Sequence, residues 1–181
     1  LKGHGIAGLS LTSKNHYGSV NGQDHSYIAN SSGYNPLVDI AGHRLVGGKT
    51  MLFAIDGLHM YRSQGDSPSN PSMPPFNGDW PSSMFVSQDP VAIDSVAFDF
   101  LYTEFTSAVN NEHYLHEEAL ADNPPSGTFY DPEADGSRLQ SLGVHEHWNN
   151  STSKQYTRNL GTGSGIELVT SQPPLLPCYP G

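Results

Sequence analysis

Hydrophobic and polar positions follow helical spacing in one part of the chain and form a continuous apolar run in the next. The stretch 35–46 carries apolar residues at helical spacing, with Asn35 placed to cap the helix and Pro36 suited to its first turn. Gly47 and its neighbour end this predicted helix. The apolar run at 50–55 predicts a strand of a sheet that is covered on both faces.

The same patterns continue toward the C-terminus. A short strand is predicted from Met84 to Val86, and a helix is predicted to follow, with Asp89 as its cap and Pro90 in its first turn. Three further elements are predicted from shorter patterns: a strand in 7–13, a helix in 110–121 and a strand in 165–169.

This succession of helices and strands predicts an α/β fold, with a mixed or mostly parallel sheet, flanking helices and long Pro/Gly-rich loops such as 62–83. The 181 residues suit a single domain at 1–170, followed by a Pro-rich linker or tail at 171–181. Because the apolar pattern starts at once, without an initiator Met, we expect the C-terminal portion of a larger domain truncated at its N-terminus.

Composition narrows the possible partners and the location. The net charge of -10 disfavours nucleic acid and anionic membrane surfaces. No apolar stretch approaches the roughly 20 residues of a membrane span. The lone Cys178 can form neither an internal disulfide nor an iron–sulfur cluster. Low charge with abundant Gly, Pro, Ser, Asn and Tyr favours an extracellular or periplasmic location.

The opening stretch carries the parts of an anion or carboxylate site. Gly5 and Gly8 permit close backbone approach to a ligand, and Asn15 adds a polar group, so these three are candidate cofactor- or ligand-binding residues. His4 and Lys14 are candidate catalytic residues, because imidazole can transfer a proton and an amine can hold an anion. The alternative is a tight turn with surface His and Lys.

Further candidates follow the predicted strand and lie on the next helix. Asp56 and His59 come after the strand, where ligand groups gather in open α/β sheets, and with His16 they are candidate metal ligands. The alternative is a turn capped by Asp56 with His59 exposed. Asp94 lies among apolar residues and should need a His, a Lys or a metal as partner, so it is a candidate catalytic residue.

Two pairs of histidines have metal-ligand spacing. His113 and His116 would share one face of a helix, and His145 and His147 would point the same way on a strand. Nine His in the chain strengthen the expectation of a divalent metal of open identity. The alternative for each pair is a set of surface histidines.

Three motifs, "LKGHGIAGLSLTSKNHYGSVNG", "GGKTMLFAIDGLHM" and "MFVSQDPVAIDSVAFDFL", resemble the domain-of-unknown-function 362 family over about residues 1–105. The resemblance implies that an α/β portion precedes this chain, either in the same protein or as a separate partner domain. Many members are described as iron–sulfur proteins because of fused ferredoxin modules. That role does not carry over, because this chain lacks the cysteines.

A shorter resemblance concerns His4 and Lys14, which lie ten residues apart in a Gly-rich frame. This spacing is similar to that in the nickel-pincer lactate racemase family, which implies a Lys that anchors the cofactor and a His that transfers a proton. No third matching His is present.

Two functions remain open at this point. One is a metal-dependent enzyme that acts on a small or carboxylate-bearing ligand, with the side chains of one crevice supplied by six residues: His4, Lys14, His16, Asp56, His59 and Asp94. The other is a non-catalytic secreted binding or surface-assembly module. The amount of metal bound by the purified protein discriminates between them.

Overall fold

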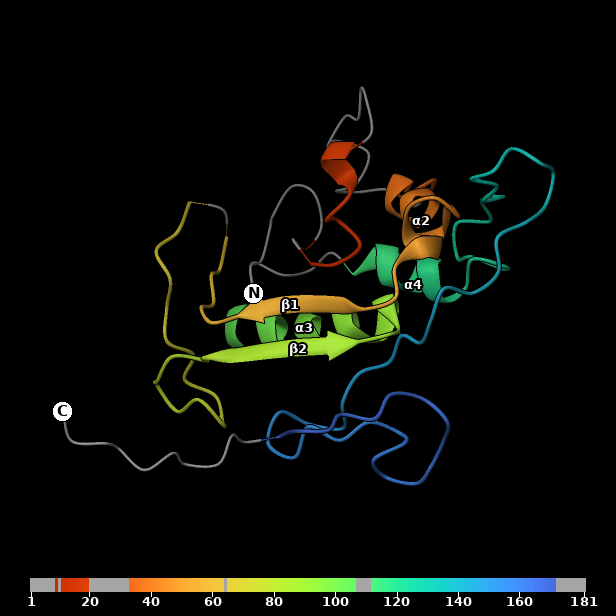
Figure 1. Cartoon of the computed structure of the whole chain (residues 1–181). Helices are drawn as coiled ribbons and strands as arrows, with labels where there is room; N and C mark the ends of the chain where they lie inside the picture. The colour runs from red at the N-terminus through yellow and green to blue at the C-terminus, as the bar shows by residue number, and fades with distance from the viewer. Residues whose placement is uncertain (1–8, 10, 20–32, 64, 107–111, 172–181) are drawn as a thin grey trace.

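A computed structural model describes residues 9, 11–19, 33–63, 65–106 and 112–171 (Figure 1). Within these ranges the chain forms three α-helices, two short 3-10 helices and two strands. In chain order they are η1 (Tyr17–Ser19), α2 (Pro36–Gly42), η2 (Gly47–Lys49), β1 (Phe53–Gly57), β2 (Ser83–Ser87), α3 (Pro90–Phe105) and α4 (His113–Ala119).

The predicted helix starts are confirmed by their caps. The Asn35 side chain accepts a hydrogen bond of 3.0 Å from the Leu37 N–H at the start of α2. The Asp89 side chain does the same for the Ala92 N–H, at 2.8 Å, at the start of α3. Both helices have Pro in the first turn, where its missing N–H costs nothing.

Strands β1 and β2 pair in antiparallel register, with Phe53 opposite Ser87 and Gly57 opposite Ser83. The expected parallel pairing is therefore not found among the described residues. Parallel neighbours need a crossover connection, usually a helix. The described part of the connection from 58 to 82 is Pro-rich and contains no helix, so it returns the chain beside β1 in the opposite direction.

Helix α3 covers one face of the two-stranded sheet, so the molecule is of mixed α/β type (Figure 1). The Phe85 and Phe100 rings pack edge to face between the two layers, 5.4 Å apart. The prediction of a strand covered on both faces is wrong, because Ala54 and Asp56 are exposed while Ile55 between them is buried. Alternation of this kind is typical of a sheet with one solvated face.

Two of the predicted strands do not form. In the described part of 7–13, residues 11–13 belong to a turn, and 165–169 has no ladder partner among the described residues. The segment 143–171, which we call the C-terminal segment, contains neither helix nor strand. Side-chain hydrogen bonds to α3 fasten it instead. None of the described helices has the length and apolar character to cross a membrane.

Candidate metal centre

Three parts of the fold bring His and carboxylate side chains together. Helix α3 presents Ser95 and Asp99, which share one face because they lie four residues apart. Glu112 lies immediately before α4. The C-terminal segment contributes His145 and His147. These five residues form the group that we call the His–Glu centre.

The ligand atoms of the His–Glu centre converge. One atom from each of Glu112, His145 and His147 lies within 4.8 Å of the other two, close enough for all three to hold one metal ion. Glu112 Oε2 is 3.2 Å from His147 Nε2 and 4.0 Å from His145 Nε2. The 3.2 Å contact has the distance of an ion pair but not the alignment of a hydrogen bond, since Glu112 Oε2 is buried without an aligned partner.

The contacts of His145 determine which of its ring nitrogens carries the hydrogen. The Ser95 hydroxyl donates its only hydrogen to the Val91 carbonyl, at 2.7 Å. It must therefore accept a hydrogen bond from His145 Nδ1–H, at 2.8 Å. In the neutral ring, Nε2 then carries a lone pair. This Nε2 atom is buried and faces Glu112, and it has no hydrogen-bond partner among the described residues. The His145 side chain is only 4% exposed.

Asp99 orients the second imidazole. The Asp99 carboxylate accepts a hydrogen bond from His147 Nδ1, at 2.7 Å, which leaves Nε2 facing Glu112. Its other oxygen accepts from the Trp148 N–H at 3.0 Å and from the Tyr156 hydroxyl at 2.8 Å. A carboxylate behind a ligating imidazole is the usual second layer of a protein metal site.

Burial and neighbouring charges separate the two imidazoles. Burial, reinforced by the charges of His116 and His147, lowers the pKa of His145 to about 4, so this ring is neutral near pH 7. The hydrogen bond to Asp99, followed by the close contact with Glu112, raises the pKa of His147 to about 10. The pKa of Glu112 is lowered, first by its contact with His116 and then by His147. Without a metal, the positive charge of His147 balances these carboxylates.

The two histidines of α4 have different surroundings. The His116 ring lies perpendicular to that of His145, with centroids 4.4 Å apart, and His116 Nε2 is 3.9 Å from Glu112 Oε1. His113 instead has its Nε2 3.6 Å from Glu117 Oε1. His116 therefore borders the His–Glu centre, whereas His113 is paired with a different carboxylate.

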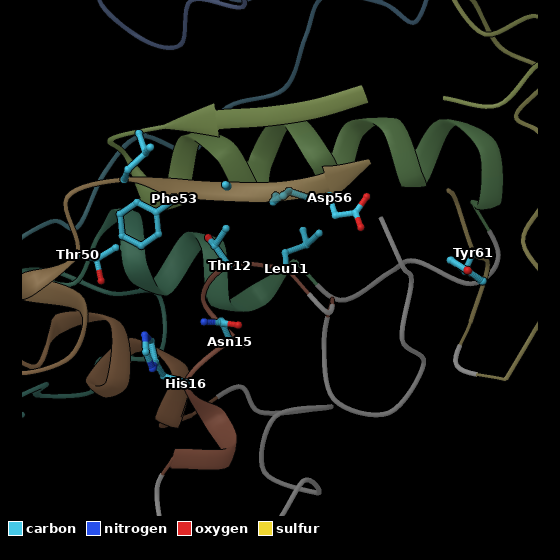
Figure 2. Close-up of a pocket in the computed structure, with 11 residues that line it drawn as sticks. Leu11, Thr12, Asn15, His16, Thr50, Phe53, Asp56 and Tyr61 are labelled. Carbon is cyan, nitrogen blue, oxygen red and sulfur yellow. The ribbon is translucent and has the colours of Figure 1, made fainter. Parts of the chain in front are cut away.

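Three of the predicted site residues line a cavity that is separate from the His–Glu centre. Asn15, His16 and Asp56 border a cavity of about 420 Å³ beside β1 (Figure 2). His16 lies toward the start of β1, and Asp56 lies at its end. Lys14 and His59 are not among the lining residues. The predicted residues His4, Gly5 and Gly8 lie outside the described residues.

Two other predicted residues have contacts of their own. His59 packs edge to face on Trp80, with ring centroids 5.1 Å apart. Asp94 is fully buried and accepts hydrogen bonds from the Thr12 N–H and hydroxyl, the Ser13 N–H and the Tyr114 hydroxyl. These partners are amides and hydroxyls rather than the expected His, Lys or metal, and they fasten the opening segment to α3.

Sequence reasoning singled out His145 and His147 but not their partners. Glu112 flanks the predicted His pair of α4, which was the available signal for its role. Asp99 gave no local signal, because its contact with His147 joins residues 48 positions apart.

Comparison with known proteins gives one match. A family model described as "Domain of unknown function (DUF362)" matches residues 1–99, more than half of the chain. No curated protein and no solved structure matches the chain. Ser95 and Asp99 lie within the matched stretch, whereas the three ligand residues of the His–Glu centre lie beyond it.

Proposed function

The chain belongs to the domain-of-unknown-function 362 family, and we propose that this member is a metal-dependent enzyme whose single divalent metal ion is held by Glu112, His145 and His147. The supporting observation is the pair of buried acceptor atoms, His145 Nε2 and Glu112 Oε2, which face each other 4.0 Å apart and have no aligned hydrogen-bond partner among the described residues. Two facing acceptors of this kind are stabilised by a cation between them.

The chemistry of the donors suits a first-row transition metal. Two imidazole nitrogens and one carboxylate oxygen are typical ligands of Zn²⁺ and are also used by Fe²⁺. Catalytic sites of this type use three protein ligands and leave a position for water or substrate, where the ion acts as a Lewis acid. We propose a small, carboxylate-bearing molecule as substrate. In this site Asp99 and Ser95 orient the two imidazoles.

One observation favours the alternative of a non-catalytic binding or surface-assembly module. His116 borders the His–Glu centre, with its ring 4.4 Å from that of His145. This makes His116 the candidate for a fourth ligand. Four protein ligands would close the site, as in structural zinc sites.

The proposal is tested by elemental analysis of purified protein that has been stripped with a chelator and then incubated with Zn²⁺, Fe²⁺, Co²⁺, Mn²⁺ or Ni²⁺. We expect one bound ion per chain, lost in His145→Ala and in His147→Ala. His16→Ala and His59→Ala are matched controls that should keep the metal, since neither side chain belongs to the His–Glu centre. Wild-type protein without stoichiometric metal, or His145→Ala protein with full metal content, would rule the proposal out.

The open-site and closed-site alternatives are separated by His116→Ala. An open catalytic site keeps its metal affinity in this variant, because His116 is not a ligand. A closed structural site loses one of four ligands and binds the ion much more weakly. The absorption spectrum of the Co²⁺ form, which reports coordination number, provides the second readout.

We also propose that the domain works outside the cytoplasm. Only 14% of the residues are charged, and the abundant Gly, Pro, Ser, Asn and Tyr are typical of extracytoplasmic proteins. Fractionation of the native host's cells tests this, with the protein expected in the periplasmic or secreted fraction. Recovery with the cytosolic markers would contradict it.

A further inference from the structure

A long cleft lies along the free edge of β2, on the side of the sheet away from the cavity in Figure 2. Its volume is about 680 Å³, within the usual range for ligand sites. All five residues of β2 line it, including the outward-facing Met84 and the inward-facing Phe85, so it follows the strand edge rather than one face of the sheet. In the part of the chain that the structure describes, β1 is the only ladder partner of β2.

The cleft has an apolar floor and a firmly held opposite wall. The floor contains three buried side chains of α3, those of Ile93, Val96 and Phe100. Residues 165–171 form the wall, on the far side of β2 from β1 (Figure 1). The wall is fastened from behind, because the Leu168 N–H donates to Asn159 Oδ1 at 2.9 Å.

Among the described residues that line the cleft, Arg158 is the one cation. The Arg158 guanidinium donates to the Ser164 carbonyl at 2.9 Å, which uses one of its five N–H groups. No carboxylate forms an ion pair with Arg158 within the described ranges, whereas Arg44 and Arg62 each have one. The two acidic residues that line the cleft do not form an ion pair with Arg158. Asp89 accepts hydrogen bonds from the Ala92 and Val144 N–H groups, and Glu167 is exposed.

We infer that this cleft binds a short extended peptide with a free C-terminal carboxylate, which adds a strand to the edge of β2. An unpaired strand edge offers backbone hydrogen bonds to an extended chain, and pockets below it select alternate side chains. The apolar floor suits aliphatic side chains at every second position. Arg158 pairs with the terminal carboxylate, which it can bind with two parallel hydrogen bonds. This inference does not rest on the proposed metal function.

Fluorescence anisotropy tests it with the peptide Gly-Thr-Val-Thr-Val, labelled with fluorescein at its N-terminus, as the free acid and as the C-terminal amide. We expect saturable binding of the acid and about 10- to 100-fold weaker binding of the amide, the range for a hydrogen bond to a charged group. Arg158→Gln should weaken binding of the acid peptide by the same factor and leave binding of the amide peptide unchanged. Arg62→Gln, which removes a cation that does not line the cleft, is the matched control.

In the anisotropy experiment, the inference would be overturned by a lack of saturable binding up to about 1 mM peptide, by equal binding of acid and amide, or by an acid–amide difference that survives in Arg158→Gln. Hydrogen exchange tests the position of the peptide. Bound peptide should slow exchange of the amides of residues 83–87, and unchanged exchange in a saturated complex would rule out strand addition. The metal content, measured separately, is expected to be the same with and without peptide.

Discussion

The Asp99 carboxylate connects α3 to three residues of the C-terminal segment. His147 Nδ1, the Trp148 N–H and the Tyr156 hydroxyl all donate to it, and its side chain is almost fully buried. The first of these bonds decides which nitrogen of His147 faces Glu112. Asp99 is therefore a positioning residue of the His–Glu centre and not a metal ligand.

Asp99→Asn should weaken Zn²⁺ binding by about 10- to 100-fold, the usual effect of losing a carboxylate behind a ligating imidazole. Competition with a chromophoric chelator measures the affinity. Asp66→Asn, which removes an exposed carboxylate paired with Arg62, controls for the change of charge and should bind Zn²⁺ normally. Equal Zn²⁺ affinities for Asp99→Asn and wild type would show that His147 does not depend on this contact.

Neighbouring buried carboxyl groups on α4 differ in their hydrogen bonds. Glu117 accepts from the Ser126 N–H, the Ser126 hydroxyl and the Tyr130 hydroxyl. Among the described residues, the Glu118 side chain accepts only from the Ser13 hydroxyl, at 3.0 Å, and its Oε1 has no partner. Burial, followed by the charge of Asp94, raises the pKa of Glu118 well above its usual value.

The raised pKa means that the folded state favours the protonated, neutral form of Glu118 over the carboxylate. Its contribution to stability is fully present below the unfolded pKa near 4.5 and is lost as the pH rises through the folded value. Glu118→Gln cannot ionise. Relative to wild type, this variant should gain thermal stability as the pH rises from 4 to 8, by about 2–4 °C for each 1 kcal/mol.

Thermal melts across this pH range provide the measurement, with Glu117→Gln as the neighbouring comparison. That variant loses acceptor capacity for Ser126 and Tyr130, so it should be destabilised at every pH. A constant difference in Tm between Glu118→Gln and wild type from pH 4 to 8 would show that Glu118 does not titrate in this way.

At the scale of elements, the C-terminal segment depends on side-chain anchors because it has no backbone ladder of its own. The Val144 N–H donates to Asp89, and His145 and His147 contact Ser95 and Asp99. A metal ion in the His–Glu centre would add bonds between this segment and Glu112, next to α4. Metal binding should therefore hold the segment against the helices.

Limited proteolysis with trypsin tests this link, because Lys154 and Arg158 both lie in the C-terminal segment. At Zn²⁺ concentrations about 100-fold above Kd, linkage adds about 2.7 kcal/mol, so cleavage at these two sites should slow by up to about 100-fold. Cleavage after Arg62, in the connection between the strands, serves as the internal control and should not change. Protection that is equal at all three sites would indicate inhibition of the protease by the metal.

The helices could be predicted from the sequence because their signals are local. Asn35 and Asp89 cap the helices that begin one residue later, and each cap joins residues two or three positions apart. Strand pairing could not be predicted in the same way. The partners Phe53 and Ser87 are 34 positions apart, and the direction of pairing depends on the path of the connection between them.

At the scale of the whole molecule, the same distinction explains what could be predicted of the site. His145 and His147 stand out because two histidines flank one residue, which is a local pattern. Their partners Ser95 and Asp99 lie about 50 positions earlier and come near only when the C-terminal segment packs on α3. Burial of Asp94 correctly predicted that its carboxylate needs partners, but not that backbone amides and hydroxyls would be those partners instead of a His, a Lys or a metal.

The cavity beside β1 is a further case at this scale. His16 and Asp56 were expected around one crevice, and both line this cavity together with Asn15. They do not join the His–Glu centre, whose ligands come from Glu112 and the C-terminal segment. Within the described ranges, His16 and Asp56 of the expected crevice line this cavity, whereas Asp94 is buried and His59 packs on Trp80.

Anomalous X-ray diffraction at the zinc edge, from crystals of the Zn²⁺-loaded protein, tests the metal centre most directly. The account predicts one strong peak about 2.0–2.2 Å from His145 Nε2, His147 Nε2 and a carboxylate oxygen of Glu112. A peak at His16, Asp56 or His59, or a map without any peak in protein that has been saturated with Zn²⁺, would contradict it.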